Sequence, residues 1–400
     1  MVLLWQHYRD SMLSAYPLVK GESKLNLPTN IVCTVLACIA FMAGTASAQE
    51  DSSTFQSVEK LYFDSVTPNS RFQLSRQTSS LKRVRVWGFL SFPEEVKAAV
   101  PAMIIAHGSA GMQQKDTERW VPFFHKMGIA TFVLDSFGPR GIKRTDEDQL
   151  VLDQSANDAD ALFALKLLAE DKRIDPARIG VIGFSRGGVV AIETAIEPFR
   201  KGVIVDDVRF AAHIAFYPGC VVRYWANPAP VTGAPIMMAL GEKDDYTPPQ
   251  PCIDYADTMK KAGVDVEVHV YDGAYHDFDN TNRYFKYWPN SVTNRNCPLS
   301  EINPVTFSEY KILKTGETYK AYKEFAPAFN YDKCAVRGVN TGSNFSAAKA
   351  AEEDVRRFLV RAFGLQNDEL RALVKKKVSV QAYPSTASTV ATSIDRTLAW

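Results

Sequence analysis

Residues 179–188 read IGVIGFSRGG. A short apolar run that ends in Gly-x-Ser-x-Gly and passes into an Ala/Val/Ile-rich segment predicts a buried strand, a sharp turn and a helix. Ser185 would sit on this turn in a strained backbone conformation, which small residues at Gly183 and Gly187 permit. The turn would place Ser185 at the amino end of the helix, where free amides favour negative charge. The alternative is an ordinary glycine-rich turn.

On either side of this stretch, β-rich apolar runs alternate with helical patterns from about residue 82 to residue 364. This alternation is typical of βαβ units, which build a mostly parallel sheet with helices on both faces. The expected strands are 83–92, 102–107, 129–135, 179–184, 210–217, 235–240 and 264–271. The expected helices are 117–127, 156–169, 187–199, 253–261 and 347–363. The sequence therefore predicts an α/β fold.

The acid and the base that would serve Ser185 are expected later in the chain, on loops at the carboxyl ends of strands. The strand at 235–240 opens into GEKDDYTPP, which offers three carboxylates. We choose Asp244, with Asp245 as the second candidate, although clustered acids on a loop are often simply solvated. His276 follows the last expected strand in DGAYHDF and is the predicted base.

The other histidines are expected to be structural. His269 alternates with valines and faces away from the core side of its strand, while His213 and His125 come in a buried strand and in a helix before the acid. His107 opens the segment HGSAG after the strand at 102–107. No second ligand lies at zinc spacing from it, so we expect no metal and no cofactor.

The HGSAG segment predicts an oxyanion hole. Its place after the second strand matches a loop whose backbone amide acts together with the amide after the nucleophile. We assign the two amides to Ser109 and Arg186. The alternative is a plain glycine-rich exit from the strand.

Composition excludes several classes of protein. The 400 residues carry 46 Lys and Arg against 45 Asp and Glu, with 46% hydrophobic residues, which lies in the ordinary globular range. A net charge of +1 offers no cationic excess for a nucleic acid backbone. There is neither G-x-G-x-x-G nor G-K-[ST] in the nucleophile segment, which excludes a dinucleotide or phosphate loop there.

The first 48 residues are expected to form a cleavable signal peptide. An apolar run at 31–44 is too short to cross a bilayer and precedes Thr-Ala-Ser-Ala, which suits cleavage after Ala48. A periplasmic or secreted protein without a stable membrane span would follow; a buried helix or short anchor is the alternative. The expected domain then covers 49–365, with an aromatic-rich insertion at 279–333 and a peripheral tail at 366–400.

Four cysteines remain after this cleavage, an even number in an oxidising compartment. Three pairings are possible. By order along the chain we favour Cys220 with Cys252 and Cys297 with Cys334.

With these residues in place, the chain resembles the dienelactone hydrolase branch of the α/β-hydrolase fold. The resemblance is carried by HGSAG, LDSFGPRG, GFSRGG, GEKDDYTPP and DGAYHDF, over about 84–278. The family's acid is the Asp of G-x-x-D-x-x-x-P, which corresponds to Asp244 followed by Pro248. The family's namesakes use cysteine as nucleophile where this chain has Ser185, so dienelactone itself is a doubtful substrate.

These features predict a serine hydrolase that cleaves a small carboxylic ester or lactone through an acyl-enzyme intermediate. The alternatives are a peptidase of the prolyl oligopeptidase type and a non-catalytic binding protein on the same scaffold. Tyr284 and Trp288 of the insertion are candidate pocket walls, or else a small satellite core. Arg140 would either clamp a substrate carboxylate or form a structural ion pair. The oligomeric state is left open.

Overall fold

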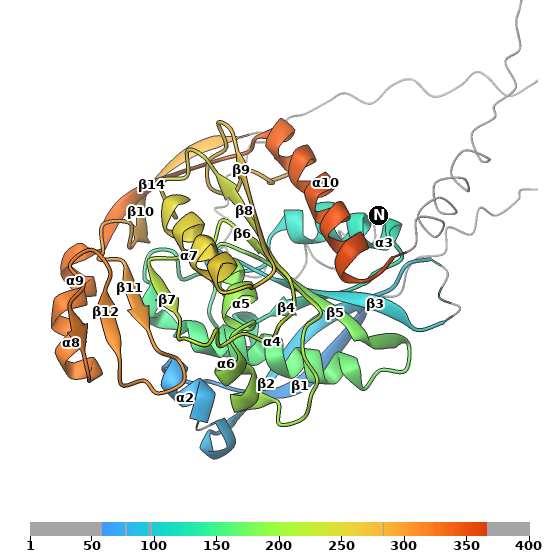
Figure 1. The fold of residues 1–400 in the computed structure, drawn as a ribbon. Helices are drawn as coiled ribbons and strands as arrows, with labels where there is room; N and C mark the ends of the chain where they lie inside the picture. Colours follow the sequence, from blue (N-terminus) through green and yellow to red (C-terminus); the bar gives the residue numbers. More distant parts are fainter. Residues whose placement is uncertain (1–57, 77, 95, 97, 283, 366–400) are drawn as a thin grey trace, which may run out of the picture. The chain divides into compact units, whose positions relative to one another are not determined.

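The central sheet has eight strands in the order β1-β2-β4-β3-β5-β6-β8-β9 (Figure 1). The computed structural model describes residues 58–365 apart from 77, 95, 97 and 283, so the expected signal peptide and tail lie outside the described residues. The strands are β1 (Glu59–Val66), β2 (Arg83–Ser91), β3 (Val100–Ala106), β4 (Ala130–Asp135), β5 (Ile174–Phe184), β6 (Ala212–Phe216), β8 (Ile236–Gly241) and β9 (Val266–Tyr271). β1–β2 and β2–β4 are antiparallel, whereas the other neighbouring pairs are parallel. The mostly parallel sheet predicted from the sequence is confirmed.

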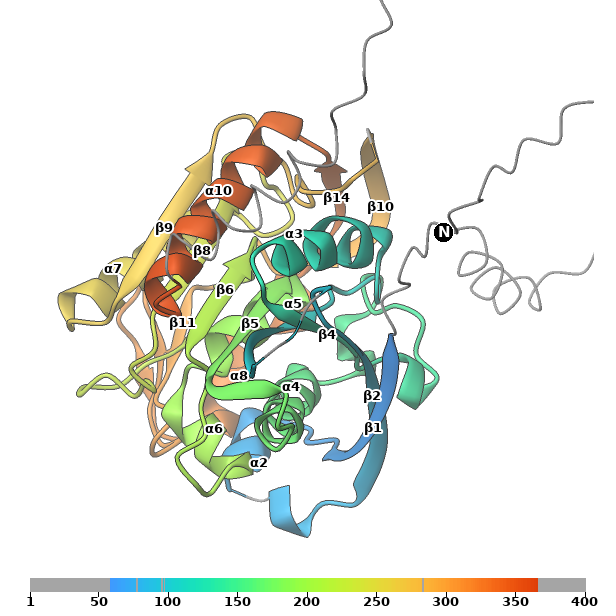
Figure 2. The ribbon, with the colours of Figure 1, turned by 90° about the vertical axis from the view of Figure 1, so that its right-hand side faces the viewer.

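Helices cover both faces of this sheet (Figure 2). One face carries α2 (Arg71–Arg76), α4 (Gln154–Ala169), α5 (Arg186–Glu193), α6 (Glu197–Val203) and α7 (Gln250–Lys261). The other carries α3 (Val121–Lys126) and α10 (Phe345–Ala362). This is the layering of an α/β-hydrolase fold.

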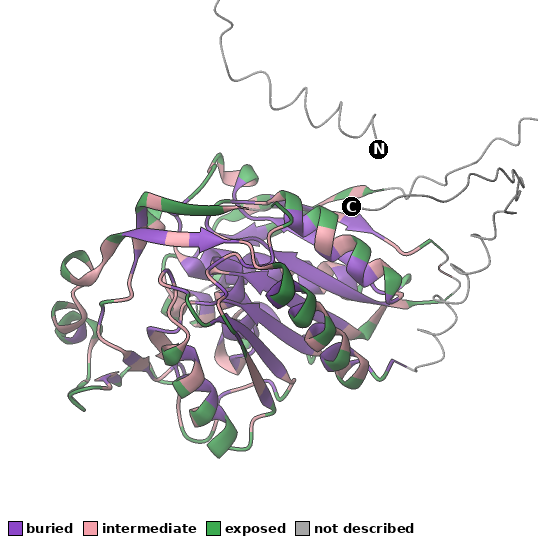
Figure 3. Ribbon diagram, turned by 90° about the horizontal axis from the view of Figure 1, so that it is seen from above, coloured by how far each residue is buried: buried purple, intermediate pink, exposed green. Residues whose placement is uncertain are grey.

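The burial of the strands explains why their sequences read as continuous apolar runs. Along β5, Val181 belongs to the core under α4 and α5, and its neighbour Ile182 belongs to the core under α3 and α10. Successive side chains of a strand point to opposite faces, so a strand covered on both faces needs apolar residues at every position. Figure 3 shows these buried strands between helices whose outer sides are exposed.

The segment expected as an insertion at 279–333 contributes strands to two small sheets, each of which also contains a strand from outside it. β10 (Phe285–Thr293) pairs with β14 (Val336–Gly342). The second sheet has the order β13-β12-β11-β7. Its strands are β7 (Val222–Tyr224), β11 (Ser300–Ile302), β12 (Tyr310–Ile312) and β13 (Thr318–Tyr319), and α8 (Tyr322–Phe329) and α9 (Tyr331–Cys334) follow β13. β11 of the insertion pairs with β7, which lies between β6 and β8 in the sequence, so the insertion packs on the domain rather than projecting as a loop.

Several elements differ from the sequence prediction, which did not contain the strands β7 and β10 to β14 or the helices α2, α8 and α9. The single helix expected at 187–199 is divided into α5 and α6, because the chain turns at Ile196, which bridges to Val231, and restarts with Pro198 in the first turn. The edge strand β1 was not predicted; its alternating exposure gives a weak apolar signal. No helix in the described part of the chain is long and apolar enough to cross a membrane.

The turn between β5 and α5 depends on glycine. A Cβ atom at Gly187 would lie 2.0 Å from the carbonyl oxygen of Ala106, and one at Gly183 would lie 1.9 Å from that of Gly187. Three backbone segments therefore meet at distances that a side chain would prevent.

We expect Gly187→Ala to lower the free energy of unfolding by about 3 kcal/mol, because the methyl group must push apart β3 and the turn. Alanine is otherwise the better helix former, so the sign of the change tests the contact. Gly219→Ala is the matched control, since its Cβ would meet only Thr247 Cγ2 at 3.8 Å. Equal urea midpoints for the two variants would contradict the prediction.

Candidate active site

The predicted nucleophile lies on a strained turn at the carboxyl end of β5. Ser185 has φ 54° and ψ −112°, a combination that costs energy for a residue with a side chain. Its N–H donates to the carbonyl of Phe216 at 2.9 Å, which ties the turn to the end of β6. Ser185 is partly exposed, although its neighbours Phe184 and Arg186 are buried. The geometry is that of a nucleophile elbow.

The predicted oxyanion loop passes directly beside this turn. A Cβ atom built on Gly108 would lie 3.5 Å from Ser185 Cβ, so the loop that contains Ser109 lies against the serine. The carbonyl of Ser109 accepts the N–H of Thr145 at 2.7 Å. Within residues 58–365, the amide hydrogens of Ser109 and Arg186 have no protein acceptor. Both amides are therefore free to bind an anionic oxygen.

His107 braces the loop rather than binding a ligand. Its Nδ1 donates to the carbonyl of Gly108 at 2.8 Å, and its Nε2 accepts the N–H of Ser136 at 3.2 Å. This pattern requires the neutral imidazole, and burial lowers the pKa of His107 accordingly.

The predicted acid and base lie together on the loops after β8 and β9. His276 Nδ1 is 2.7 Å from Asp244 Oδ2, and both residues are only 4% exposed. Asp244 Oδ1 accepts the N–H groups of Tyr246 and Thr247, each at 2.9 Å. The carboxylate is thereby fixed, and since Nδ1 donates to it, Nε2 of His276 carries a free lone pair.

Two aromatic rings enclose the imidazole of His276. The ring centre of Tyr217 lies 4.6 Å from it and that of Tyr246 lies 4.7 Å from it. Tyr217 directly follows Phe216, which holds the amide of Ser185, and its carbonyl accepts the Thr247 hydroxyl at 3.0 Å. The serine turn and the base are thus connected through one residue pair at the end of β6.

A buried ionic cluster lies behind the imidazole and was not predicted. Lys115 Nζ is 2.6 Å from Asp277 Oδ1 and 3.0 Å from Asp279 Oδ1, and it also donates to the hydroxyl of Tyr217. Burial lowers the pKa of Lys115, but the carboxylates of Asp277 and Asp279 outweigh it, and the net pKa is raised. Asp277 and Tyr217 have φ of 64° and 38°, so this cation holds two residues in unusual conformations on either side of the base.

The sequence contained half of the signal for this cluster. Asp277 and Asp279 follow His276 in HDFD, but nothing in the sequence near Lys115 indicates a partner more than 160 residues away.

Asp116, the neighbour of Lys115, is also buried, and its Oδ1 has no hydrogen-bond partner among the described residues. Burial raises the pKa of Asp116 to about 7.

Asp245, the second candidate acid, has a different role. It accepts the backbone N–H of Asn340 at 2.8 Å and the side-chain amide of the same residue at 2.7 Å. β14 is further joined to the base, because the N–H of Gly342 donates to the carbonyl of His276 at 3.0 Å. Asp245 therefore anchors the β10–β14 sheet beside the site.

Arg140 forms the structural ion pair rather than a substrate clamp. Its guanidinium makes a two-point contact with Asp160, at 2.7 and 3.0 Å, and also donates to Thr67 and to the carbonyls of Val66 and Ser136. With these contacts and a side chain only 8% exposed, it has no free donor to offer a substrate.

The two aromatic wall candidates are partly buried on the insertion. The hydroxyl of Tyr284 donates to Asp277, and Trp288 Nε1 donates to Thr341 Oγ1 at 2.8 Å. Thr341 pairs with His276 in a short parallel bridge, so both rings are attached to the strand beside the base. Their role as pocket walls stays a prediction.

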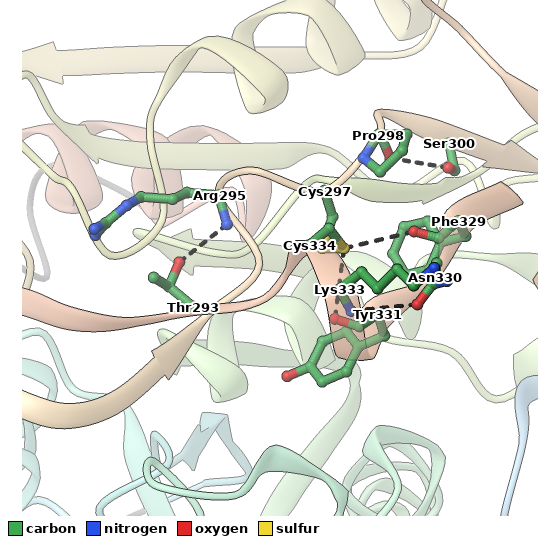
Figure 4. The surroundings of a disulfide bond; sticks show 10 residues. All are labelled: Thr293, Arg295, Cys297, Pro298, Ser300, Phe329, Asn330, Tyr331, Lys333 and Cys334. Carbon is green, nitrogen blue, oxygen red and sulfur yellow. Dashed lines mark hydrogen bonds between the residues drawn. A yellow bond between two sulfur atoms is a disulfide. The ribbon is translucent and has the colours of Figure 1, made fainter. Parts of the chain in front are cut away.

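Two disulfide bonds join the cysteines in the expected pairs. Cys220–Cys252 links the segment after β6 to the first turn of α7, which follows the acid loop. Cys297–Cys334 closes the insertion at α9. Figure 4 shows the ring of Tyr331, in the first turn of α9, projecting away from this disulfide.

We expect Lys115→Met to lower the free energy of unfolding by about 3–5 kcal/mol, because Asp277 and Asp279 would remain buried without their cation. Denaturant titration at pH 7 measures the change. Lys260→Met, on the exposed side of α7, is the control. Similar stability of the two variants would contradict the structural role of the cluster.

The raised pKa of Asp116 gives a pH dependence with a definite sign. The folded chain keeps a proton that the unfolded chain releases, so this group reduces stability as pH rises from about 4 to about 7. Asp116→Asn should therefore gain stability relative to the parent over that interval and keep a constant advantage, of at most about 4 kcal/mol, above it. Melting temperatures of both proteins at pH 4.5, 6 and 8 test this. An advantage that does not grow with pH would refute it.

Comparisons with known proteins identify the family to which the sequence is similar. The family model described as "Dienelactone hydrolase family" matches residues 86–297. Protein usf of Aquifex pyrophilus is 28% identical over 214 residues, which covers 52% of this chain and 87% of that protein. An uncharacterised protein of Mycobacterium tuberculosis is 27% identical over 234 residues, covering 54% of this chain and 80% of that protein. Among solved structures, a thermophilic esterase from Thermogutta terrifontis has a TM-score of 0.40 at 19% identity, covering 50% of this chain and 81% of that one.

Proposed function

This chain belongs to the dienelactone hydrolase family, and we propose that it is a serine hydrolase that cleaves carboxylic esters or lactones with Ser185, His276 and Asp244. The observation that carries the proposal is an imidazole whose Nδ1 is held by a carboxylate, on loops at the same edge of the parallel sheet as Ser185 on its strained elbow. Such a pairing is what nucleophilic catalysis by a hydroxyl group requires.

In the first half of the reaction, Nε2 of His276 accepts the proton of Ser185 Oγ as Oγ attacks the ester carbonyl carbon. The carbonyl oxygen becomes an oxyanion, which the amides of Ser109 and Arg186 bind. The protonated imidazole then gives its proton to the alcohol oxygen as the bond to the acyl carbon breaks. The products of this half are an alcohol and an acyl-Ser185 ester.

In the second half, His276 takes a proton from water, and the hydroxide attacks the acyl carbon. The second oxyanion collapses, and Ser185 Oγ leaves with the proton from the imidazole. The net reaction adds one water across the ester bond. A lactone follows the same steps, with its alcohol remaining attached to the acid.

The surroundings of the base suit this cycle. Asp244 stabilises the imidazolium that forms in each half, and the rings of Tyr217 and Tyr246 limit access of water to it. Ser185 Oγ and His276 share no hydrogen bond in the described residues. Catalytic hydrogen bonds are often long in the free state and shorten when substrate binds. Each oxyanion-hole amide contributes about 3 kcal/mol to the transition state.

The finer features are proposals of the same kind. We assign Tyr284 and Trp288 to the wall of the substrate pocket, because the first is hydrogen-bonded to Asp277, next to His276, and the second to Thr341, which pairs with His276. We also propose a single catalytic domain over 49–365 with the insertion as part of it. Two disulfide bonds favour a periplasmic or secreted location.

The test combines covalent labelling with turnover of p-nitrophenyl acetate and butyrate. We expect a fluorophosphonate to modify Ser185 alone, as located by peptide mass spectrometry, and Ser185→Ala to lose both labelling and turnover. Asp244→Asn should lower kcat by about 10³ to 10⁴, since the imidazole loses its charged partner. Asp245→Asn, which touches β14 instead, is the matched control and should stay within tenfold of the parent. Turnover that survives Ser185→Ala would reject the proposal.

A further inference from the structure

One side chain is hydrogen-bonded to both residues of the proposed oxyanion hole and to the tyrosine beside His276, without touching Ser185, His276 or Asp244. Gln149 lies in the 3₁₀ turn Gln149–Val151 between β4 and α4, far from the catalytic residues in sequence. We propose that Gln149 is a positioning residue. Its side chain holds the two arms of the oxyanion hole, Ser109 and Arg186, in a fixed position relative to the ring of Tyr246 beside His276. This inference rests on the proposed function.

The amide oxygen of Gln149 joins the two arms of the oxyanion hole. Oε1 accepts the hydroxyl of Ser109 at 3.0 Å and Nη1 of Arg186 at 3.2 Å. These are the two residues whose backbone amides are assigned to the oxyanion. One arm comes from the loop after β3 and the other from the start of α5, so no backbone hydrogen bond need link them. Gln149 supplies that link through their side chains.

The amide nitrogen of Gln149 reaches the base side of the site. Nε2 donates to the hydroxyl of Tyr246 at 3.3 Å, and the ring of Tyr246 lies 4.7 Å from the imidazole of His276. Tyr246 also gives its backbone N–H to the carboxylate of Asp244. A planar amide with fixed donor and acceptor ends therefore spans the distance from the oxyanion hole to the acid–base pair.

The turn that carries Gln149 is itself held firmly. Asp148 Oδ1 accepts the N–H of Leu150 at 3.0 Å, and the guanidinium of Arg186 donates to the carbonyls of Gln149 and Leu152. The same guanidinium donates to Asn157 on α4 at 2.9 Å. The backbone at Gln149 is thus fixed to α4 and α5 through the guanidinium of Arg186.

The physical effect follows from the distance dependence of oxyanion binding. Gln149 does not touch the reacting atoms, so its loss removes no catalytic group. It leaves the Ser109 hydroxyl and one guanidinium N–H without their acceptor, and both arms can then shift. A displacement of about 1 Å at a reacting centre can reduce the rate by about 10²-fold. Substrate binding in the ground state does not depend on this alignment.

The experiment compares Gln149→Ala, Gln149→Glu and the exposed control Leu150→Ala. For Gln149→Ala we expect kcat on p-nitrophenyl acetate to fall about tenfold to a hundredfold, with KM within threefold of the parent. Binding of a trifluoromethyl ketone, which forms a tetrahedral oxyanion on Ser185, should weaken by the same factor. Gln149→Glu keeps an acceptor for both arms and should recover most of the rate. The control should match the parent.

The pH profile is a further readout, and four outcomes are decisive. The acidic limb of the kcat/KM profile should be unchanged in Gln149→Ala, because His276 and Asp244 keep their contacts; a shifted limb would mean that the residue acts on the base and would overturn the inference. An unchanged kcat, or a rate that fails equally in Gln149→Glu, would also overturn it. If the parent protein neither turns over esters nor accepts the fluorophosphonate on Ser185, the proposed function fails first. An active parent with an active Gln149→Ala rejects only the present inference.

Discussion

The site depends on how closely three backbone segments approach one another at the end of β5. Gly187 lies against the carbonyl of Ala106, Gly183 lies against Gly187, and Gly108 lies against Ser185. Because no side chain separates these segments, the loop after β3 and the first turn of α5 lie directly beside Ser185. The left-handed conformation of Ser185 has an energetic cost, and the parallel pairing of β3, β5 and β6 holds the turn in place against it.

Two adjacent carboxylates in the loop after β8 point in different directions and bind different partners. Asp244 and Asp245 are adjacent, yet the first accepts from the imidazole and from its own turn, while the second accepts from β14. Neighbouring residues in an irregular loop point to different sides, so one carboxylate binds the imidazole of His276 and the next attaches β14. Lys115 supports the other loop, the one that carries His276, through its ion pairs with Asp277 and Asp279.

The sequence was sufficient for features that depend on local pattern. Apolar runs predicted β5 and its neighbours, since strands buried on both faces must be apolar throughout, and Gly-x-Ser-x-Gly predicted the elbow. It was insufficient where partners are distant. Lys115 contacts Asp277, which is more than 160 residues away in the sequence, and Gln149 contacts Tyr246, which is nearly 100 residues away. Arg140 was left with two roles because its partner Asp160 lies inside α4, and a helical pattern does not say which loop residue packs against a given face of the helix.

The attachment of β14 to the base has a consequence for how such proteins diversify. The peptide groups of His276 are hydrogen-bonded to the strand that carries Thr341 and Gly342. A lineage that remodels β14 therefore also alters the support of His276. Substitutions in β10 reach the same loop in two ways, through the pairing with β14 and through the ring of Phe285, whose centre lies 4.9 Å from that of Tyr275. Variation in this sheet and variation in the position of the proposed base are therefore coupled.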